Sequence, residues 1–410
     1  MPARTALIAL QYRNYRLLWL GTFISMAGSM MRNAALLWHV SLLVPPGKKA
    51  IALGAMGLTR AVPIVLGSLV AGVAADAFDR RRVLLVTNTV MMLVSSALAL
   101  ITFLGVHHPW PIYALATVSA GAATFDNPAR NAFFPTLVPR EHLPNAISLN
   151  SIVFQSASVI GPLFAGLIIG VSGVGPVYVV DAVSFLVLGG SLLAMRDLPP
   201  PFVGERLTMG PRAAWEGLRF VFQNSLIRSS MLLDFFATFF ASATALLPIY
   251  AQDILRVGAH GYGVLASATA VGAVSTSLLL VPLLDRIAQR GRVLVSAAVV
   301  YGLVTVGFGA SKVFLLSCAF LFLAGSADMV STVLRNVIRQ LSTPDQMRGR
   351  MTSVNMIFFM GGPQLGELEA GVVAQAFGPV ASVVSGGFGC VLAVLWIAGR
   401  TPLLRNYRRE

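Results

Sequence analysis

A dozen long apolar runs restrict the fold of this chain more than any other feature. Each run is roughly 18 to 27 residues long, the length that an α-helix needs to cross about 30 Å of hydrocarbon. Only 11% of the 410 residues are charged, compared with about 25% in an ordinary soluble domain. The runs therefore predict an all-α membrane protein with twelve transmembrane helices. The expected spans are 17–43, 51–76, 83–105, 111–133, 145–170, 175–195, 229–252, 262–284, 293–310, 313–335, 350–376 and 380–399.

The positive charges are distributed unevenly between the two sides of these spans. Of the 30 Lys and Arg residues, 24 lie at one side, four lie in the loops of the other side, and Arg32 and Arg60 lie within helices. Basic residues accumulate on the cytoplasmic side of inner-membrane proteins. The bias predicts an inner (plasma) membrane protein with both termini in the cytoplasm. It also accounts for the net charge of +14 without a nucleic-acid partner.

The second half of the chain repeats the first. At an offset of 205, residues 130–166 align with 335–371 without a gap, and eleven of the 37 pairs are identical, among them Arg130/Arg335 and Asn150/Asn355. Six spans per half is an even number, so both halves share one orientation, as in parallel-repeat transporters. We expect an N-terminal six-helix bundle at 1–195, a cytoplasmic linker at 196–228 and a C-terminal six-helix bundle at 229–410. The linker should contain an amphipathic helix, because Trp215, Leu218 and Phe222 share a helical face.

The end of the second span carries a glycine, an aspartate four residues later and then a basic cluster. Gly72 and Asp76 are followed by Arg80 and Arg81, and Arg130 lies at the inner end of the fourth span. A carboxylate at a helix C-terminus is opposed by the helix dipole, so Asp76 needs nearby cations. From the residues alone, the cluster can be a simple positive-inside anchor.

This pattern resembles the loop signature of the major facilitator superfamily. The stretch from Phe125-Asp126 through Pro139-Arg-Glu141 and the segment Tyr15-Arg16-Leu-Leu-Trp19 are similar to its exporter branch, which contains the enterobactin exporter and related drug:proton antiporters. The likeness covers nearly the whole chain. It implies a major facilitator fold and a cytoplasmic gate motif, a latch that closes the cytoplasmic side, formed by Gly72, Asp76, Arg80, Arg81 and Arg130. Asp79 and Ala77 depart from the signature, where the family usually has glycine and often a basic residue. Gly161-Pro162 in span five resembles part of the helix-bend motif of antiporters, and a packing kink is the alternative.

Charged residues inside the spans are the candidates for transport and proton coupling, because each costs about 2.5 to 3.5 kcal/mol in a membrane helix. A carboxylic acid that is removed from water favours its neutral form and can therefore carry a proton. Our order of preference for the coupling carboxylate is Asp328, Glu367 and Asp126, although Asp126 and Arg130 also have the spacing of an intrahelical pair. Arg32 and Arg60 are the expected substrate or counter-charge partners. Asp181, in a peripheral span, is expected to form structural hydrogen bonds.

Neutral polar residues mark the expected lining of a cavity. They are Ser25, Ser29, Gln155 and Gln364. Gln364 shares a helical face with Glu367, whereas Glu369 lies about 200° around the same helix. Glu367 is therefore expected in the cavity and Glu369 outside it. The alternative role for the polar residues of span five is hydrogen bonding between helices.

The sequence has no phosphate-binding loop, so transport should be driven by an ion gradient. We expect a secondary active exporter of small amphipathic organic molecules, of drug or siderophore type, working by alternating access with the proton as counter-ion. Its partners would be the substrate, protons and the lipid bilayer; no cofactor, metal or catalytic residue is expected, and the monomer would suffice. Uptake or facilitated transport by the same fold is an alternative. An intramembrane enzyme using Asp126 and Asp328 is disfavoured because the Gly-x-Gly-Asp setting of aspartyl proteases is missing.

Overall fold

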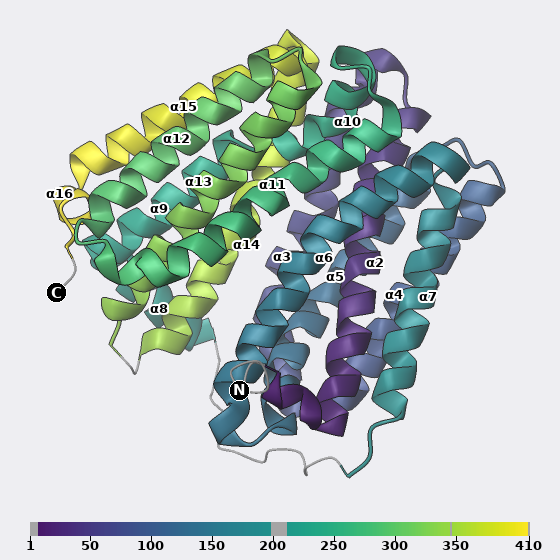
Figure 1. The fold of residues 1–410 in the computed structure, drawn as a ribbon, viewed down its shortest axis with the longest axis horizontal. Coiled ribbons are helices and arrows are strands. Elements are labelled where there is room, and N and C mark those ends of the chain that lie inside the picture. Colours follow the sequence, from purple (N-terminus) through teal and green to yellow (C-terminus); the bar gives the residue numbers. More distant parts are fainter. Residues whose placement is uncertain (1–6, 198–210, 345–346, 409–410) are drawn as a thin grey trace. The chain divides into compact units, whose positions relative to one another are not determined.

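The computed structural model describes residues 7–197, 211–344 and 347–408. Within these ranges, side chains are described except at 68–77, 211–215, 217, 281–282, 285, 348–350, 353 and 357. The described chain is helical and contains no β-strand. The predicted all-α fold is therefore confirmed (Figure 1).

Twelve long helices account for most of the chain. In the first half they are α2 (Arg13–Leu43), α3 (Lys49–Ala77), α4 (Arg80–Phe103), α5 (Trp110–Phe133), α6 (Leu143–Ser172) and α7 (Gly175–Leu193). In the second half they are α9 (Ser225–Phe240), α11 (Gly258–Leu280), α12 (Arg290–Ala310), α13 (Phe314–Leu341), α14 (Arg348–Phe377) and α15 (Pro379–Arg400). Shorter elements connect them: η1 (Ile8–Gln11), η2 (Pro46–Lys48), η3 (Phe134–Leu137), η4 (Arg140–His142), α8 (Pro211–Gln223), η5 (Ala243–Leu246), α10 (Leu247–Ile249), η6 (Tyr250–Ile254), η7 (Val281–Arg286) and α16 (Pro402–Arg405).

Nine helical segments among the described residues are long and apolar enough to cross a membrane. The long helices outside that set are α2, α5 and α14. These three contain Arg32, the pair Asp126 and Arg130, and Glu367. Intrahelical charges also occur in helices of the set, such as Asp181 in α7 and Asp328 in α13, and charges inside membrane helices are usually retained for function.

The seventh span is interrupted, although its composition predicts one continuous helix over 229–252. Helix α9 ends at Phe240, and the chain continues through η5, α10 and the π-helical segment η6 to Ile254. Pro248 has no backbone N–H to donate, so regular α-helix cannot continue unchanged through it. The Ser242 hydroxyl donates to the carbonyl of Pro363 at 3.2 Å, which fixes the interruption to α14.

The described chain forms two compact units. The first comprises Met1–His39 with Val62–Leu207, and the second comprises Val40–Ala61 with Thr208–Glu410. In the first unit, α4 runs beside α5 and α7, and α2 is tied to the start of α6. Two aromatic side chains of the family-like segment make these ties: the Tyr15 hydroxyl donates to the Ala146 carbonyl at 2.9 Å, and the Trp19 indole donates to the Leu149 carbonyl at 3.0 Å.

The second unit contains the end of α2 and the first part of α3 in addition to α8 through α16. Helices α12 and α15 run side by side within it (Figure 1). The predicted linker helix is present as α8, and it packs onto α9 and α14 through Leu218, Phe220 and Val221. Phe222 remains exposed. The side chain of Trp215 lies outside the described residues.

Small residues allow α3 and α14 to cross at backbone contact. A Cβ atom placed on Gly371 would lie 2.6 Å from the Cα of Gly54, and a Cβ placed on Gly54 would lie 2.8 Å from the Cα of Gly371. Close approach of this kind is a common way to join helices in membranes, where no hydrophobic driving force brings them together. The crossing places the side chains that follow on α3 directly against α14.

We expect Gly371→Ala to destabilise the protein by about 1 to 3 kcal/mol, because the added methyl group overpacks this crossing. Gly361→Ala, in the same helix, is the matched control, since no atom lies within 4 Å of its added Cβ. That control should be neutral or slightly stabilising, as alanine is the better helix former. Thermal unfolding of the detergent-purified protein measures both. Equal melting temperatures would contradict the close crossing.

Candidate functional site

A network of two arginines and two aspartates lies inside the second unit. Arg335 of α13 pairs with Asp234 of α9 at 2.9 Å and with Asp328, also of α13, at 3.6 Å. Arg339, one helical turn beyond Arg335, lies 3.7 Å from the second carboxylate oxygen of Asp234. The Arg335 side chain is only 1% exposed, so its charge is balanced almost entirely by these partners. Three of the four residues come from α13, and their spacings of seven and four residues place them along one face of it.

The internal repeat explains why this network differs from its counterpart in the first half. Arg335 corresponds to Arg130 at the offset of 205, and Ser331 stands where the first half has Asp126. The Ser331 hydroxyl accepts a hydrogen bond from Arg335 at 2.9 Å, so the position still faces the arginine but brings no charge. The balancing carboxylate comes instead from Asp234 on another helix. The sequence prediction left Asp234, Arg335 and Arg339 out of the site.

Asp328 is the least buried member of the network. Its side chain is 41% exposed, although the residue lies near the middle of the 28-residue helix α13. Its neighbour in the network, Arg335, also donates to the Thr332 hydroxyl at 2.8 Å. The network thus has a buried ion pair at one end and a carboxylate open to its surroundings at the other.

A second ion pair joins α3 to α14 beside the glycine crossing. The Arg60 guanidinium lies 3.5 Å from the carboxylate of Glu367, and the Glu367 side chain is 7% exposed. In the described residues, one oxygen of Glu367, one nitrogen of Arg60 and the side-chain oxygen of Gln364 have no hydrogen-bond partner. The pair is therefore buried but incompletely satisfied. The prediction that Glu367 and Gln364 share one helical face fits their common position against α3, where the Cβ of Glu367 and the backbone of Gln364 adjoin Gly57.

Asp126 and Arg130 form the intrahelical pair that their spacing predicts. The Arg130 Nε donates to the Asp126 carboxylate at 3.0 Å, and both side chains are nearly buried. The Thr87 hydroxyl of α4 donates to the other carboxylate oxygen at 2.9 Å. Asp126 therefore has partners on both oxygens within the first unit, and its carboxylate is held on α5.

Arg32 is held by Asp181, which accepts from the guanidinium at 2.9 Å and from the Ser95 hydroxyl at 2.5 Å. The hydrogen bonding expected for Asp181 is thus observed. All three groups are buried in the first unit. The structure places Arg32 in this α2–α4–α7 contact, with Asp181 as its paired carboxylate. The role of Arg32 as a substrate or counter-charge partner stays a prediction.

The remaining predicted residues fall into different settings. Ser25 is buried in the packed interior of the first unit, whereas Ser29, Gln155 and Gln364 are partly exposed. Gly161 lies against Met30 and Met31 of α2, so that a side chain there would collide with α2. This contact gives the Gly161-Pro162 pair a packing role in α6, and Pro162 lies within a helix that continues to Ser172.

The basic cluster at the start of α4 is anchored to helix ends. Arg80 donates to the Ala132 carbonyl at 2.9 Å, and Arg81 donates to the Leu192 and Leu193 carbonyls at 2.9 and 3.2 Å. Cations at such positions satisfy the unpaired carbonyls of a helix C-terminus and its negative dipole end. The side chain of Asp76 and the surroundings of Gly72 lie outside what the structure describes. The gate interpretation of the motif stays a prediction.

Known proteins resemble this chain in both sequence and fold. A family model described as a transmembrane secretion effector matches residues 4–406. The enterobactin exporter EntS of Citrobacter koseri is 27% identical over 345 residues, which cover 84% of this chain and 82% of the relative. EntS of Escherichia coli K12 is 26% identical with the same coverage.

Solved transporter structures share the fold at low sequence identity. A bacterial homologue of the human lysosomal transporter Spinster, in an inward-facing and unoccupied conformation, superimposes with a TM-score of 0.75 at 15% identity, covering 97% of this chain and 99% of that one. The nucleoside transporter NupG gives a TM-score of 0.70 at 14% identity, covering 96% and 100%. The fold, the family match and the exporter relatives agree with the resemblance seen in the sequence. The chain belongs to the transmembrane secretion effector family, in the exporter branch of the major facilitator superfamily, and is a multi-pass inner-membrane transporter of small molecules.

Proposed function

We propose that this protein is a proton-coupled exporter of small amphipathic organic molecules that works as a monomer by alternating access. The observation that carries this proposal is Asp328, a carboxylate 41% exposed near the middle of a membrane helix and 3.6 Å from Arg335. A charged group at this depth is too costly to face lipid. Asp328 therefore faces a water-filled space, where a proton can reach it.

Protonation of Asp328 would change the charge balance within the network. When Asp328 is ionised, Arg335 has two negative partners, Asp328 and Asp234; when Asp328 is protonated, only Asp234 remains. The charge of Arg335 is then less well balanced. Arg335 is attracted to Asp234 on α9 more strongly than to the neutral Asp328 on its own helix, α13. Protonation of Asp328 would thereby change how strongly α13 is attracted to α9. A cationic group on a substrate would compete with the proton for the same carboxylate.

The Arg60–Glu367 pair is proposed as a second group that responds to substrate or proton. Its unsatisfied atoms mean that neither partner is locked by a full set of hydrogen bonds. The orientation follows from the charge bias of the loops, with both termini in the cytoplasm. Export as the direction is supported by the EntS relatives, which are named as exporters of enterobactin, a likeness that also supports a siderophore or drug-like cargo.

The proposal is tested by dye efflux from cells or inside-out vesicles that lack other pumps. Vesicles with an imposed proton gradient should accumulate an amphipathic dye, and a protonophore should abolish the accumulation. Accumulation that persists after the gradient has collapsed would exclude proton coupling. If the protein transports none of the dyes in a broad panel, this substrate class would be excluded.

Glu367→Gln should reduce gradient-driven transport several-fold, because Arg60 loses the charge that balances it. The matched control is Glu369→Gln, the same change two residues along α14 and about 200° around the helix. The control should retain wild-type transport. Initial rates of dye uptake into vesicles, normalised to the amount of folded protein, measure both variants. Equal rates in Glu367→Gln and wild type would remove Glu367 from the mechanism.

A further inference from the structure

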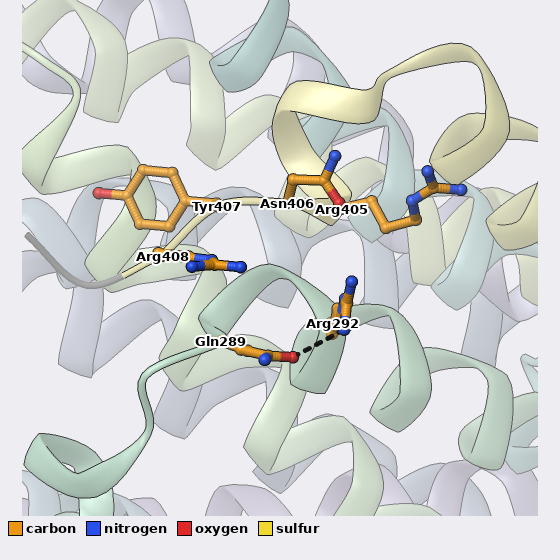
Figure 2. Close-up of a pocket in the computed structure, with 6 residues that line it drawn as sticks. All are labelled: Gln289, Arg292, Arg405, Asn406, Tyr407 and Arg408. Atoms are coloured by element: carbon orange, nitrogen blue, oxygen red, sulfur yellow. Dashed lines mark hydrogen bonds between the residues drawn. The ribbon is translucent and has the colours of Figure 1, made fainter.

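The C-terminal segment builds a basic pocket against the start of α12. The pocket is small, with a cavity volume of about 40 Å³, and is lined by Gln289, Arg292, Arg405, Asn406, Tyr407 and Arg408 (Figure 2). Three of these six residues are arginines, and the other three are neutral residues that can form hydrogen bonds. Among the residues that the structure describes, no acidic side chain lines the pocket. The role of this pocket is separate from the transport site proposed above.

The pocket is a folded part of the second unit. Leu404 of α16 is fully buried in the core formed by α9, α12, α13 and α15, which anchors the segment that follows it. The backbone N–H of Gly291 donates to the Tyr407 carbonyl at 3.0 Å. The Leu404 carbonyl lies so close to Gly291 that a side chain on Gly291 would collide with it. Glycine at 291 therefore permits the contact that forms one wall.

The positive charge of the pocket is not balanced within the described chain. Arg292 donates to the Gln289 side chain at 3.1 Å, as the dashed line in Figure 2 shows. Among the residues that the structure describes, none of the three arginines has a carboxylate within ion-pair distance. The 21-residue helix α12 also begins here, and its N-terminus adds partial positive charge. The site is thus complementary to an anion.

The chemistry of the lining residues favours a phosphate group. Guanidinium groups bind phosphate through paired N–H donors, and several arginines can surround its tetrahedral oxygens. All three arginines are exposed, so a phosphate group can contact their guanidinium groups from the open side of the pocket.

We propose that this pocket binds the phosphate of an anionic phospholipid headgroup. The proposed orientation places the C-terminus at the cytoplasmic side, where anionic lipids attract basic residues beside the membrane. Arg292, Arg405 and Arg408 are all exposed, and Arg292 lies at the wall formed by α12. Binding would hold the C-terminal segment against α12 and link the second unit to the inner leaflet.

The test is a lipid titration of the purified full chain in neutral detergent, followed by thermal unfolding. Dispersed phosphatidylglycerol should raise the melting temperature, whereas phosphatidylcholine with the same acyl chains should not, because binding to the folded state alone stabilises it. The double variant Arg405→Gln/Arg408→Gln should weaken the apparent affinity for phosphatidylglycerol by about ten-fold or more, since two charge-assisted contacts are lost. Both side chains are exposed, so the variant should fold.

The matched control is Arg16→Gln/Arg140→Gln, which removes the same charge from exposed residues outside the pocket. It should keep the wild-type response to phosphatidylglycerol. An equal loss of apparent affinity in both variants would show that net charge alone attracts the lipid. That result would overturn the proposed lipid site. Inorganic phosphate is the third arm, and stabilisation by it to the same extent as by the lipid would assign the pocket to a soluble phosphate compound instead of a headgroup.

Discussion

Asp328→Asn is expected to abolish gradient-driven accumulation of substrate while the protein remains folded. Asparagine has nearly the same shape but cannot exchange a proton, so substrate movement loses its link to the proton gradient. For a neutral substrate exchanged for one proton, 100 mV supplies about 2.3 kcal/mol, or about a 40-fold concentration ratio. The variant should reduce this ratio to about one. Downhill exchange of labelled for unlabelled substrate should continue.

Asp253→Asn is the matched control for this experiment. Asp253 is also a carboxylate paired with a cation, Lys49, at 3.1 Å, and its side chain is 48% exposed, close to the value for Asp328. It lies at the end of η6, outside the middle of a membrane helix. The accumulation ratio should stay at the wild-type value in this control. A wild-type ratio in Asp328→Asn would assign coupling to another group.

Arg335→Gln is expected to cause the largest loss of stability. The substitution leaves Asp234 buried without its 2.9 Å partner and removes the balancing charge near Asp328. Removal of one partner from a buried ion pair typically costs about 3 to 5 kcal/mol. Unfolding in denaturant, followed by the amount of monodisperse protein, measures the effect. Arg219→Gln, at an exposed position of α8, should change the stability little.

A double variant separates the charge imbalance from simple loss of contact. Asp234→Asn together with Arg335→Gln removes both charges of the buried pair, so most of the stability should return. Arg339 retains its hydrogen bond to Asn336 at 2.6 Å and can still be held on α13. A double variant no more stable than Arg335→Gln alone would show that packing, and not charge balance, explains the single effect.

The all-α fold was predictable because the long apolar runs have the length that a helix needs to cross a bilayer. The interruption of the seventh span was less predictable. The irregular segment at 241–246 lies just before Pro248, and there Ser242 donates to the backbone of α14. That partner lies far away in the sequence. The local pattern therefore predicted the helix but not the residues at which tertiary contacts interrupt it.

The candidate site was also predictable only in part. Asp126 and Arg130 could be paired from their spacing, because residues four apart on a helix are neighbours. The Asp234–Arg335 and Arg32–Asp181 pairs join different helices, and no spacing in the sequence states which helices are adjacent. The repeat offered one usable signal. Ser331 replaces the acid that accompanies Arg130 in the first half, which indicates that Arg335 needs a carboxylate from elsewhere.

The most direct test of proton-coupled export is simultaneous measurement of proton and substrate fluxes in proteoliposomes that contain only this protein. A pH-sensitive dye reports the lumen while a labelled amphipathic substrate is added on the side that corresponds to the cytoplasm. The account predicts that substrate entry is accompanied by proton release from the lumen in a fixed ratio, and that Asp328→Asn loses the proton signal. Substrate entry without any proton movement in the wild-type protein would contradict it.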